Sequence, residues 1–218
     1  MKLSKDDIQF IDTYLENSDF RHVDIRMEML DHVATAIEKE IAEGDKRPFI
    51  KVFKDYMVKN KMDLINSKHK FVKAALMKNL KLIAKFCFST KGVAVEVVIF
   101  CLIYFGLIHY DVDTIKKILY LATIGVFIFP MLTYFILIYV LKLQKVSSVD
   151  RLGVVFTVFF QFVNFANLMT REKEAWTASP VLIAVLISIV FTLSFAFTIV
   201  GYQVIKNANI QNKQLKLQ

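Results

Sequence analysis

The chain has 218 residues and a formal net charge of +8, and 56% of its residues are hydrophobic. That fraction is high for a water-soluble domain of this length. Most of the charge lies in residues 1–91, whereas long apolar runs fill residues 92–205. This division excludes a single soluble domain and predicts an all-α protein, in which a small cytoplasmic helical domain precedes a four-helix transmembrane bundle.

Residues 1–66 are predicted to form a domain of three short helices. Ser4 followed by Asp7 has the spacing of a capping box, which favours a helix start. A second helix is expected to end at Gly44, and Pro48 marks the start of the third. So short a chain buries little apolar surface, and we expect the membrane region or a partner to complete its core.

Charged side chains on the second helix form the first candidate site. Glu28 and His32 are four residues apart and could share a metal ion, but no second cluster supplies further ligands. A pair of charges within the helix is the simpler interpretation, and we expect no metal site. The helix is instead a candidate for binding a cytoplasmic protein partner, through Arg26, Glu28, Asp31 and His32.

The same helix resembles part of a known family. Residues 24–33 read Asp-Ile-Arg-Met-Glu-Met-Leu-Asp-His-Val, and with the following Glu38 and Glu40 they resemble the helical signature of HAAS-type domains. The resemblance covers residues 4–65. HAAS-type domains are small α-helical domains that precede membrane helices in bacterial proteins. The resemblance implies a regulatory role, often beside transcription regulators, and it brings no catalytic residues.

Residues 67–91 are predicted to form a basic amphipathic helix next to the membrane. In a helical projection the apolar residues fall on one side, with Asn79 as the exception among them. This pattern is typical of a helix that lies on an anionic inner leaflet. The alternative is a fourth helix of the soluble domain with a solvated basic face. That basic face consists of Lys73, Lys78, Lys81 and Lys85.

Four apolar runs are long enough, or nearly so, to cross a bilayer, which takes about 20 residues. Their length and their lack of alternating polarity favour helices over strands. Buried helices of a soluble protein are the alternative, but the rest of the chain is too small to cover four of them. The expected spans are residues 92–110, 115–141, 152–169 and 180–205, and residues 206–218 form a cytoplasmic tail.

Few polar residues interrupt these runs. Gln161, Asn164 and Asn167 in the third run are spaced i, i+3 and i+6, so they share one face. We expect these amides to point into the bundle, as contacts between helices or, alternatively, along a substrate path. Pro130 is expected to kink the second span. Glu96 in the first span is expected to pair or to reach the cytoplasmic interface.

Basic residues near the ends of the runs predict the orientation. Lysines crowd the chain before the first run and follow the fourth, and Lys142, Lys145 and Arg151 lie between the second and third. Both termini are therefore expected in the cytoplasm, in a multi-pass protein of the cell (inner) membrane. The opposite side carries fewer basic residues, namely Lys116, Lys117, Arg171 and Lys173.

No motif in the sequence indicates an enzyme: a glycine-rich phosphate loop, HExxH, GxSxG and a CxxC pair are all missing. We expect no catalytic residues and no cofactor. His109, Asp111 and Asp113 come nearest to a cluster, but Asp113 before Thr114 is more simply the N-cap of the second span. The positive-inside rule already explains the excess of basic residues, so nucleic acid is not an expected partner.

The favoured function is a non-enzymatic regulatory or signalling membrane protein whose cytoplasmic domain binds a protein partner. The outer loops are too short to hold an external ligand domain. The alternative is a small transporter or channel subunit that uses the amides of the third span and the kink at Pro130. Four spans are few for a monomeric pathway, so this alternative requires a homo-oligomer. The anionic inner leaflet is the third expected partner.

Overall fold

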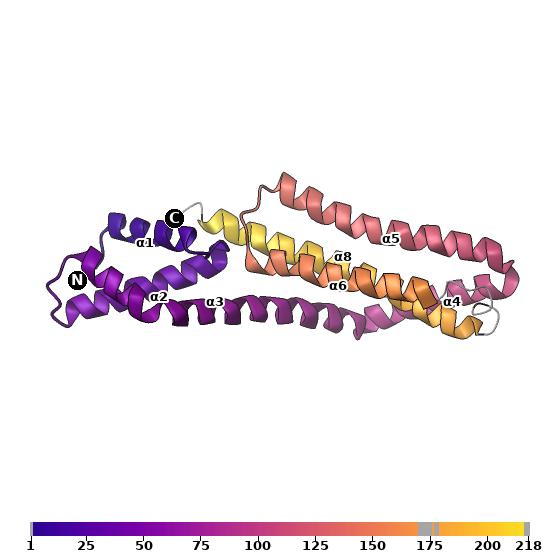
Figure 1. The fold of residues 1–218 in the computed structure, drawn as a ribbon. Coiled ribbons are helices and arrows are strands. Elements are labelled where there is room, and N and C mark those ends of the chain that lie inside the picture. The colour runs from indigo at the N-terminus through magenta and orange to yellow at the C-terminus, as the bar shows by residue number, and fades with distance from the viewer. Residues whose placement is uncertain (1, 170–175, 177–178, 216–218) are drawn as a thin grey trace. The chain divides into compact units, whose positions relative to one another are not determined.

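The computed structural model describes residues 2–169, 176 and 179–215, and all secondary structure in these residues is helical (Figure 1). The all-α prediction is therefore confirmed. The chain divides into two compact units: unit 1 comprises Met1–Ala75 with Gln144–Asp150, and unit 2 comprises Leu76–Leu143 with Arg151–Gln218. The helices are α1 (Lys5–Asn17), α2 (Val23–Ala42), α3 (Phe49–Cys87), α4 (Thr90–His109), α5 (Val112–Val140), α6 (Ser147–Met169) and α8 (Pro180–Leu215).

Helix α1 begins with the predicted capping box. The Ser4 hydroxyl accepts a hydrogen bond from the Asp7 backbone N–H at 3.2 Å, and the Asp7 carboxylate accepts the Ser4 N–H at 3.1 Å. These bonds satisfy amide groups at the helix start that have no partner inside the helix. Ile11 and Leu15, four residues apart, lie on one face of α1 and are fully buried.

Helix α2 supplies the centre of unit 1. Its buried residues Ile25, Met29, Val33 and Ile37 are spaced by four and form one stripe. The chain leaves the helix through Gly44, whose φ of +107° is readily adopted only by glycine, as predicted for the end of this helix. The stripe packs in one core with residues of α1, the turn that follows it and α3, namely Ile11, Leu15, Phe20, Val52, Phe53, Tyr56, Met57 and Leu64.

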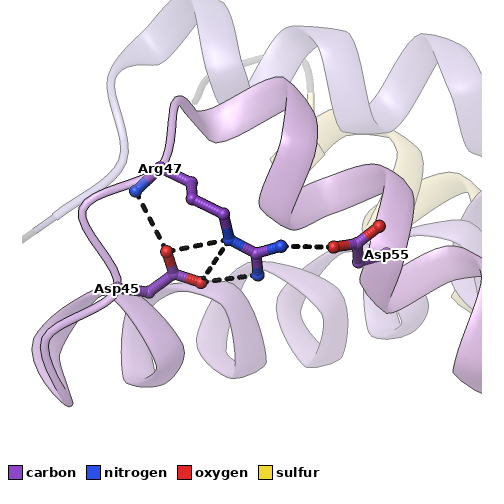
Figure 2. Close-up of polar contacts among 3 residues, drawn as sticks. All are labelled: Asp45, Arg47 and Asp55. Atoms are coloured by element: carbon purple, nitrogen blue, oxygen red, sulfur yellow. Dashed lines mark hydrogen bonds and ion pairs between the residues drawn. The ribbon is translucent and has the colours of Figure 1, made fainter.

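The turn between α2 and α3 is tied to α3 by Arg47 (Figure 2). The guanidinium lies between two carboxylates, with Nη2 2.7 Å from Asp45 Oδ2 and Nη1 2.5 Å from Asp55 Oδ2. The Arg47 backbone N–H also donates to Asp45 at 3.0 Å. The side-chain hydrogen bond from Arg47, and then its backbone hydrogen bond, lower the pKa of Asp45 from 3.8 to about 2.

Helix α3 is one continuous helix from Phe49 to Cys87. The sequence predicted a third domain helix and a separate juxtamembrane helix over residues 67–91, but the structure has no break between them. The reason is that residues 49–87 contain no glycine or proline that would end or kink a helix. The boundary between the two units lies inside this helix, after Ala75.

In unit 2, helix α8 packs against both α4 and α5. Ile103 of α4 clusters with Ile183 of α8. Glu96, which comes earlier in α4, accepts a hydrogen bond at 2.7 Å from Ser188, which comes later in α8. Helices α4 and α8 therefore run antiparallel. The Ser188 hydroxyl also gives Glu96 a polar partner on another helix, as the sequence allowed.

Three of the described helices are long and apolar enough to cross a membrane: α4, α5 and α8. Helix α6 covers the third predicted span but is not among them. Helix α8 continues to Leu215, so residues 206–215 of the predicted tail are helical. The outer residues Arg171 and Lys173 lie outside the described residues.

Helix α5 begins earlier than predicted. Asp111, and not Asp113, is its N-cap: the Asp111 carboxylate accepts the N–H of Asp113 at 3.1 Å and that of Thr114 at 3.3 Å. The helix continues through Pro130, and the Thr133 hydroxyl donates to the Phe129 carbonyl at 3.0 Å. The kink at Pro130 stays a prediction.

Replacing Ile37 by alanine tests the core of unit 1. Because Ile37 is fully buried, we expect the substitution to destabilise unit 1 by about 2–5 kcal/mol. Hydrogen exchange of the α1 and α2 amides in detergent-solubilised protein measures the change. Thr35→Ala, at an exposed position of the same helix, is the control and should lower the stability of unit 1 by less than about 0.5 kcal/mol. Equal exchange in the two variants would contradict the packing.

The pKa of Asp45 provides a second test. Its lowered value means that the contact with Arg47 stabilises the fold above pH 3.8, and that this contribution is lost as the pH falls toward about 2. Carboxyl-carbon NMR of the full chain should therefore show Asp45 titrating near pH 2. Arg47→Gln should return the pKa toward 3.8, whereas Lys46→Gln should leave it unchanged. An Asp45 that titrates at its ordinary value would contradict the contact.

Candidate functional site

The segment Gln144–Asp150 belongs to unit 1 and is called the docked loop below. It joins α5 to α6 in the chain and includes the first residues of α6. Val146, Ser147 and Val149 are only 4–6% exposed. Connecting segments normally run over the surface, because their backbone polar groups need partners. The burial of this one therefore requires specific contacts.

Asp24, in the first turn of α2, provides the main contact by capping the start of α6. Its two carboxylate oxygens lie 3.0 and 3.2 Å from the Ser147 backbone nitrogen, and the Ser147 hydroxyl donates to the same carboxylate. The first N–H groups of a helix lack partners within the helix and carry partial positive charge, so a carboxylate at this position is stabilising.

Two further contacts fix the docked loop at the start of α2. The Val23 N–H donates to the Lys145 carbonyl at 2.9 Å, so the backbones meet directly. His22, the N-cap residue of α2, has its Nε2 atom 3.5 Å from Asp150 Oδ2. This contact is an ion pair only when the imidazole is protonated.

A polar cavity of about 540 Å³ adjoins the docked loop. Arg21 and Lys145 on its wall are exposed, and their positive charges favour an anionic group or an acidic peptide side chain. The lining residues come from the end of α1, the turn after it, the start of α2 and the docked loop. They are Glu16, Asn17, Arg21, Val23, Arg26, Gln144 and Lys145.

Of the four predicted partner-binding residues of α2, three are exposed and Arg26 is paired with α1. Arg26 is 12% exposed, and its guanidinium lies 2.9 Å from Asp12 Oδ1 and 2.6 Å from Glu16 Oε1 of α1. Arg26 therefore holds α1 and α2 together, which differs from the prediction. Glu28, Asp31 and His32 are exposed along α2 and remain candidates for binding a partner. We call these three residues the α2 strip.

The predicted basic face lies on the surface of α3. All four of its lysines, Lys73, Lys78, Lys81 and Lys85, are exposed. On the opposite side, Phe86 contacts Phe195 of α8, with ring centroids 6.0 Å apart, and Asn79 is fully buried. Part of the apolar side thus packs on protein, so the helix does not offer this side freely to a bilayer.

The predicted bundle-interior amides are placed differently from the prediction. Gln161 and Asn164 are both exposed in this chain, and the side chain of Asn167 lies outside the described part of the structure. The inward face of α6 is instead aromatic and aliphatic. The ring centroids of Phe156 and of Phe127 in α5 lie 4.5 Å apart, and Val163 is buried. At 3.6 residues per turn, Gln161 lies roughly opposite Val163.

No metal-binding cluster occurs in the part of the chain that the structure describes, since no three His, Cys, Asp or Glu side chains come together there. Glu28 and His32 are exposed without further ligands nearby in that part. His109 contacts the Phe105 carbonyl through Nδ1 at 3.0 Å, and Asp111 is occupied as the N-cap of α5.

The contact between the docked loop and α2 was not predicted from the sequence. Asp24 and Ser147 are 123 residues apart, and no local pattern connects them. The acidic residue in the first turn of α2 is already explained by its own helix, whose N-terminus favours negative charge. The one available signal was the unusual run Val-Ser-Ser-Val-Asp, which starts α6 with apolar residues beside the hydroxyls.

Removing the Asp24 carboxylate tests the contact. Asp24→Ala leaves the buried Ser147 N–H without its acceptor. We therefore expect the free energy that protects the first amides of α6 from hydrogen exchange to fall by about 1–2 kcal/mol. The measurement is hydrogen exchange of amides 146–150 in the full chain. Asp24→Asn, which keeps one acceptor, should be intermediate, and exposed Asp31→Ala should have no effect. Unchanged exchange in Asp24→Ala would show that the cap is not formed.

No protein-family model matches the chain, and no curated protein or solved structure is significantly similar to it. The resemblance of residues 4–65 to HAAS-type domains therefore stays a prediction, and the function is argued from the chain's own contacts.

Proposed function

We propose that the chain is a non-enzymatic regulatory membrane protein, in which a cytoplasmic helical domain binds a protein partner and passes that event to the membrane helices. The observation that carries the proposal is the Asp24–Ser147 contact. It attaches the helical domain to the segment that links α5 to α6. A partner that moves the start of α2 therefore acts on α6 through the docked loop.

The α2 strip is the proposed partner surface. Glu28, Asp31 and His32 are exposed on the same helix whose first turn holds the docked loop. A helix is a rigid element, so a force on the strip reaches Asp24 without rearranging the core. The polar cavity beside the docked loop offers a second contact for an acidic group of the same partner. A HAAS-type domain is consistent with this role.

Contacts within each unit support four crossings with both termini in the cytoplasm. The docked loop contacts the domain that precedes α4, so α4 and α5 start and end on one side of the membrane. Helix α8 runs antiparallel to α4, so it starts on the other side, and α6 is the helix that must cross between them. The lysines beside α4 and after α8 favour the cytoplasm for the first side, in the cell (inner) membrane.

The basic face of α3 is proposed to meet anionic headgroups. Lys73, Lys78, Lys81 and Lys85 are exposed, and each lysine near an anionic surface contributes about 1 kcal/mol. Because part of the apolar side of this helix packs on protein, the contact would be made by long lysine side chains rather than by insertion of the helix.

A small oligomeric transporter or channel subunit is the second candidate. One observation favours it: Gln161 and Asn164 are exposed on a helix that we propose crosses the membrane. Amides in hydrocarbon seek partners, and a second copy of α6 would provide them. Apolar substitutions of Gln161 and Asn164 separate the candidates. They should abolish an oligomeric pathway but leave partner binding through the α2 strip unchanged.

Affinity purification of the full chain after chemical crosslinking in cells tests the first proposal. The intact chain should retain one cytoplasmic protein in a fixed ratio, and Glu28→Ala/Asp31→Ala/His32→Ala should lower its recovery at least tenfold. Glu43→Ala/Asp63→Ala, which removes two exposed acidic side chains elsewhere in unit 1, is the matched control. Bound partner should also change hydrogen exchange of the docked loop. Equal recovery by all variants would contradict the proposal.

A further inference from the structure

A groove of about 520 Å³ lies between α5 and α8, within unit 2. Its volume falls within the range of about 300–1,000 Å³ that small-molecule sites occupy. Phe129 and Pro130 of α5 and Phe197 of α8 line one end, and Ile205 and Lys206 line the other. Most of the wall is therefore apolar, with a single lysine at one end.

The two threonine hydroxyls that line the groove bond to backbone carbonyls of their own helices. The Thr133 hydroxyl donates to the Phe129 carbonyl at 3.0 Å, and the Thr198 hydroxyl donates to the Ser194 carbonyl at 2.9 Å. These groups offer no free donor to an occupant. The interior therefore suits a hydrocarbon chain better than a polar solute.

The groove runs along the membrane helices and ends where α8 becomes polar. Phe129 to Leu137 of α5 and Phe197 to Lys206 of α8 line it, which corresponds to a length of about 12 Å at 1.5 Å per residue. Lys206 follows the last apolar residues of α8 and precedes Asn207 and Asn209. This end consequently lies at the lipid–water interface, whereas the Phe129 end lies deeper in the apolar region.

Two features leave the groove open for an occupant. A Cβ atom added to Gly201, on the groove wall, would meet no atom within 4 Å. Lys206 makes no ion pair with any residue among those that the structure describes, and the Tyr202 side chain beside it is exposed. The middle of the groove therefore has room for carbon atoms, and the interfacial end has a positive charge to place beside an anion.

We propose that this groove binds one anionic phospholipid of the adjoining leaflet, with an acyl chain along α5 and α8 and its phosphate beside Lys206 and Tyr202. Charge complementarity selects this occupant, since the cation stands only at the interfacial end. A helix of a second copy would need an apolar face along its whole length, and a lysine would oppose its apolar end. This inference requires that the helices lie in a membrane, but not that the chain is regulatory.

The test uses the full chain in a neutral detergent, with phosphatidylglycerol or phosphatidylcholine of equal chain length as the probe. Native mass spectrometry counts bound lipid. We expect one phosphatidylglycerol per chain and at least tenfold weaker binding of phosphatidylcholine. Lys206→Gln should remove the preference for the anionic lipid. Gly201→Leu, whose Cβ atom has open space and whose longer side chain occupies the groove, should abolish binding of both lipids.

Gly125→Leu is the matched control, because Gly125 of α5 has equally open space and does not line the groove. It should bind lipid as the unaltered chain does. The proposal is overturned if Gly201→Leu retains the lipid, if the two lipids bind equally to the unaltered chain, or if the unaltered chain is a dimer that Gly201→Leu alone separates. Inorganic phosphate that competes fully with the lipid would equally overturn it, because binding would then not involve the acyl chain.

Discussion

One carboxylate links the parts of the sequence that local patterns leave separate. Asp24 accepts the Ser147 N–H and hydroxyl, and this contact holds the segment between α5 and α6 against the helical domain. Because that domain comes before α4 in the chain, the contact supports our proposal that α4 starts and α5 ends on the same side of a membrane. The proposals on topology and on regulation both depend on this contact.

The apolar helices follow the rule that polar groups in an apolar medium need partners. Glu96 takes a hydrogen bond from Ser188 on a neighbouring helix, and the threonines of the α5–α8 groove bond to their own backbone. Gln161 and Asn164 of α6 are exposed instead, so in a bilayer they would require a partner from outside the chain. Lys206 similarly makes no ion pair with a described residue, and we propose that the groove beside it binds a lipid.

Sequence patterns correctly predicted the features that depend on interactions between residues close together in the chain. The capping box at Ser4, the apolar stripe of α2 and the glycine that ends it all follow from interactions within a few residues. The inward face of α6 could not be read in this way, because the spacing of its amides defines a face but not which face packs. Phe156 lies on the packed face, where it contacts Phe127 of α5 and Phe197 of α8. Arg26 resembled a free surface charge until α1 supplied its two acidic partners, and the cap at Ser147 depends on a residue 123 positions away.

Labelling of single cysteines in intact cells tests the central claim most directly. In a chain with Cys87→Ser and Cys101→Ser, single cysteines are introduced as Gln144→Cys, Ser179→Cys or Asn207→Cys and exposed to a membrane-impermeant maleimide. The account predicts labelling of Ser179→Cys before permeabilisation and of the other two only after it. Labelling of Gln144→Cys or Asn207→Cys from outside, or protection of Ser179→Cys until permeabilisation, would contradict a four-span chain whose docked loop shares the cytoplasm with the helical domain.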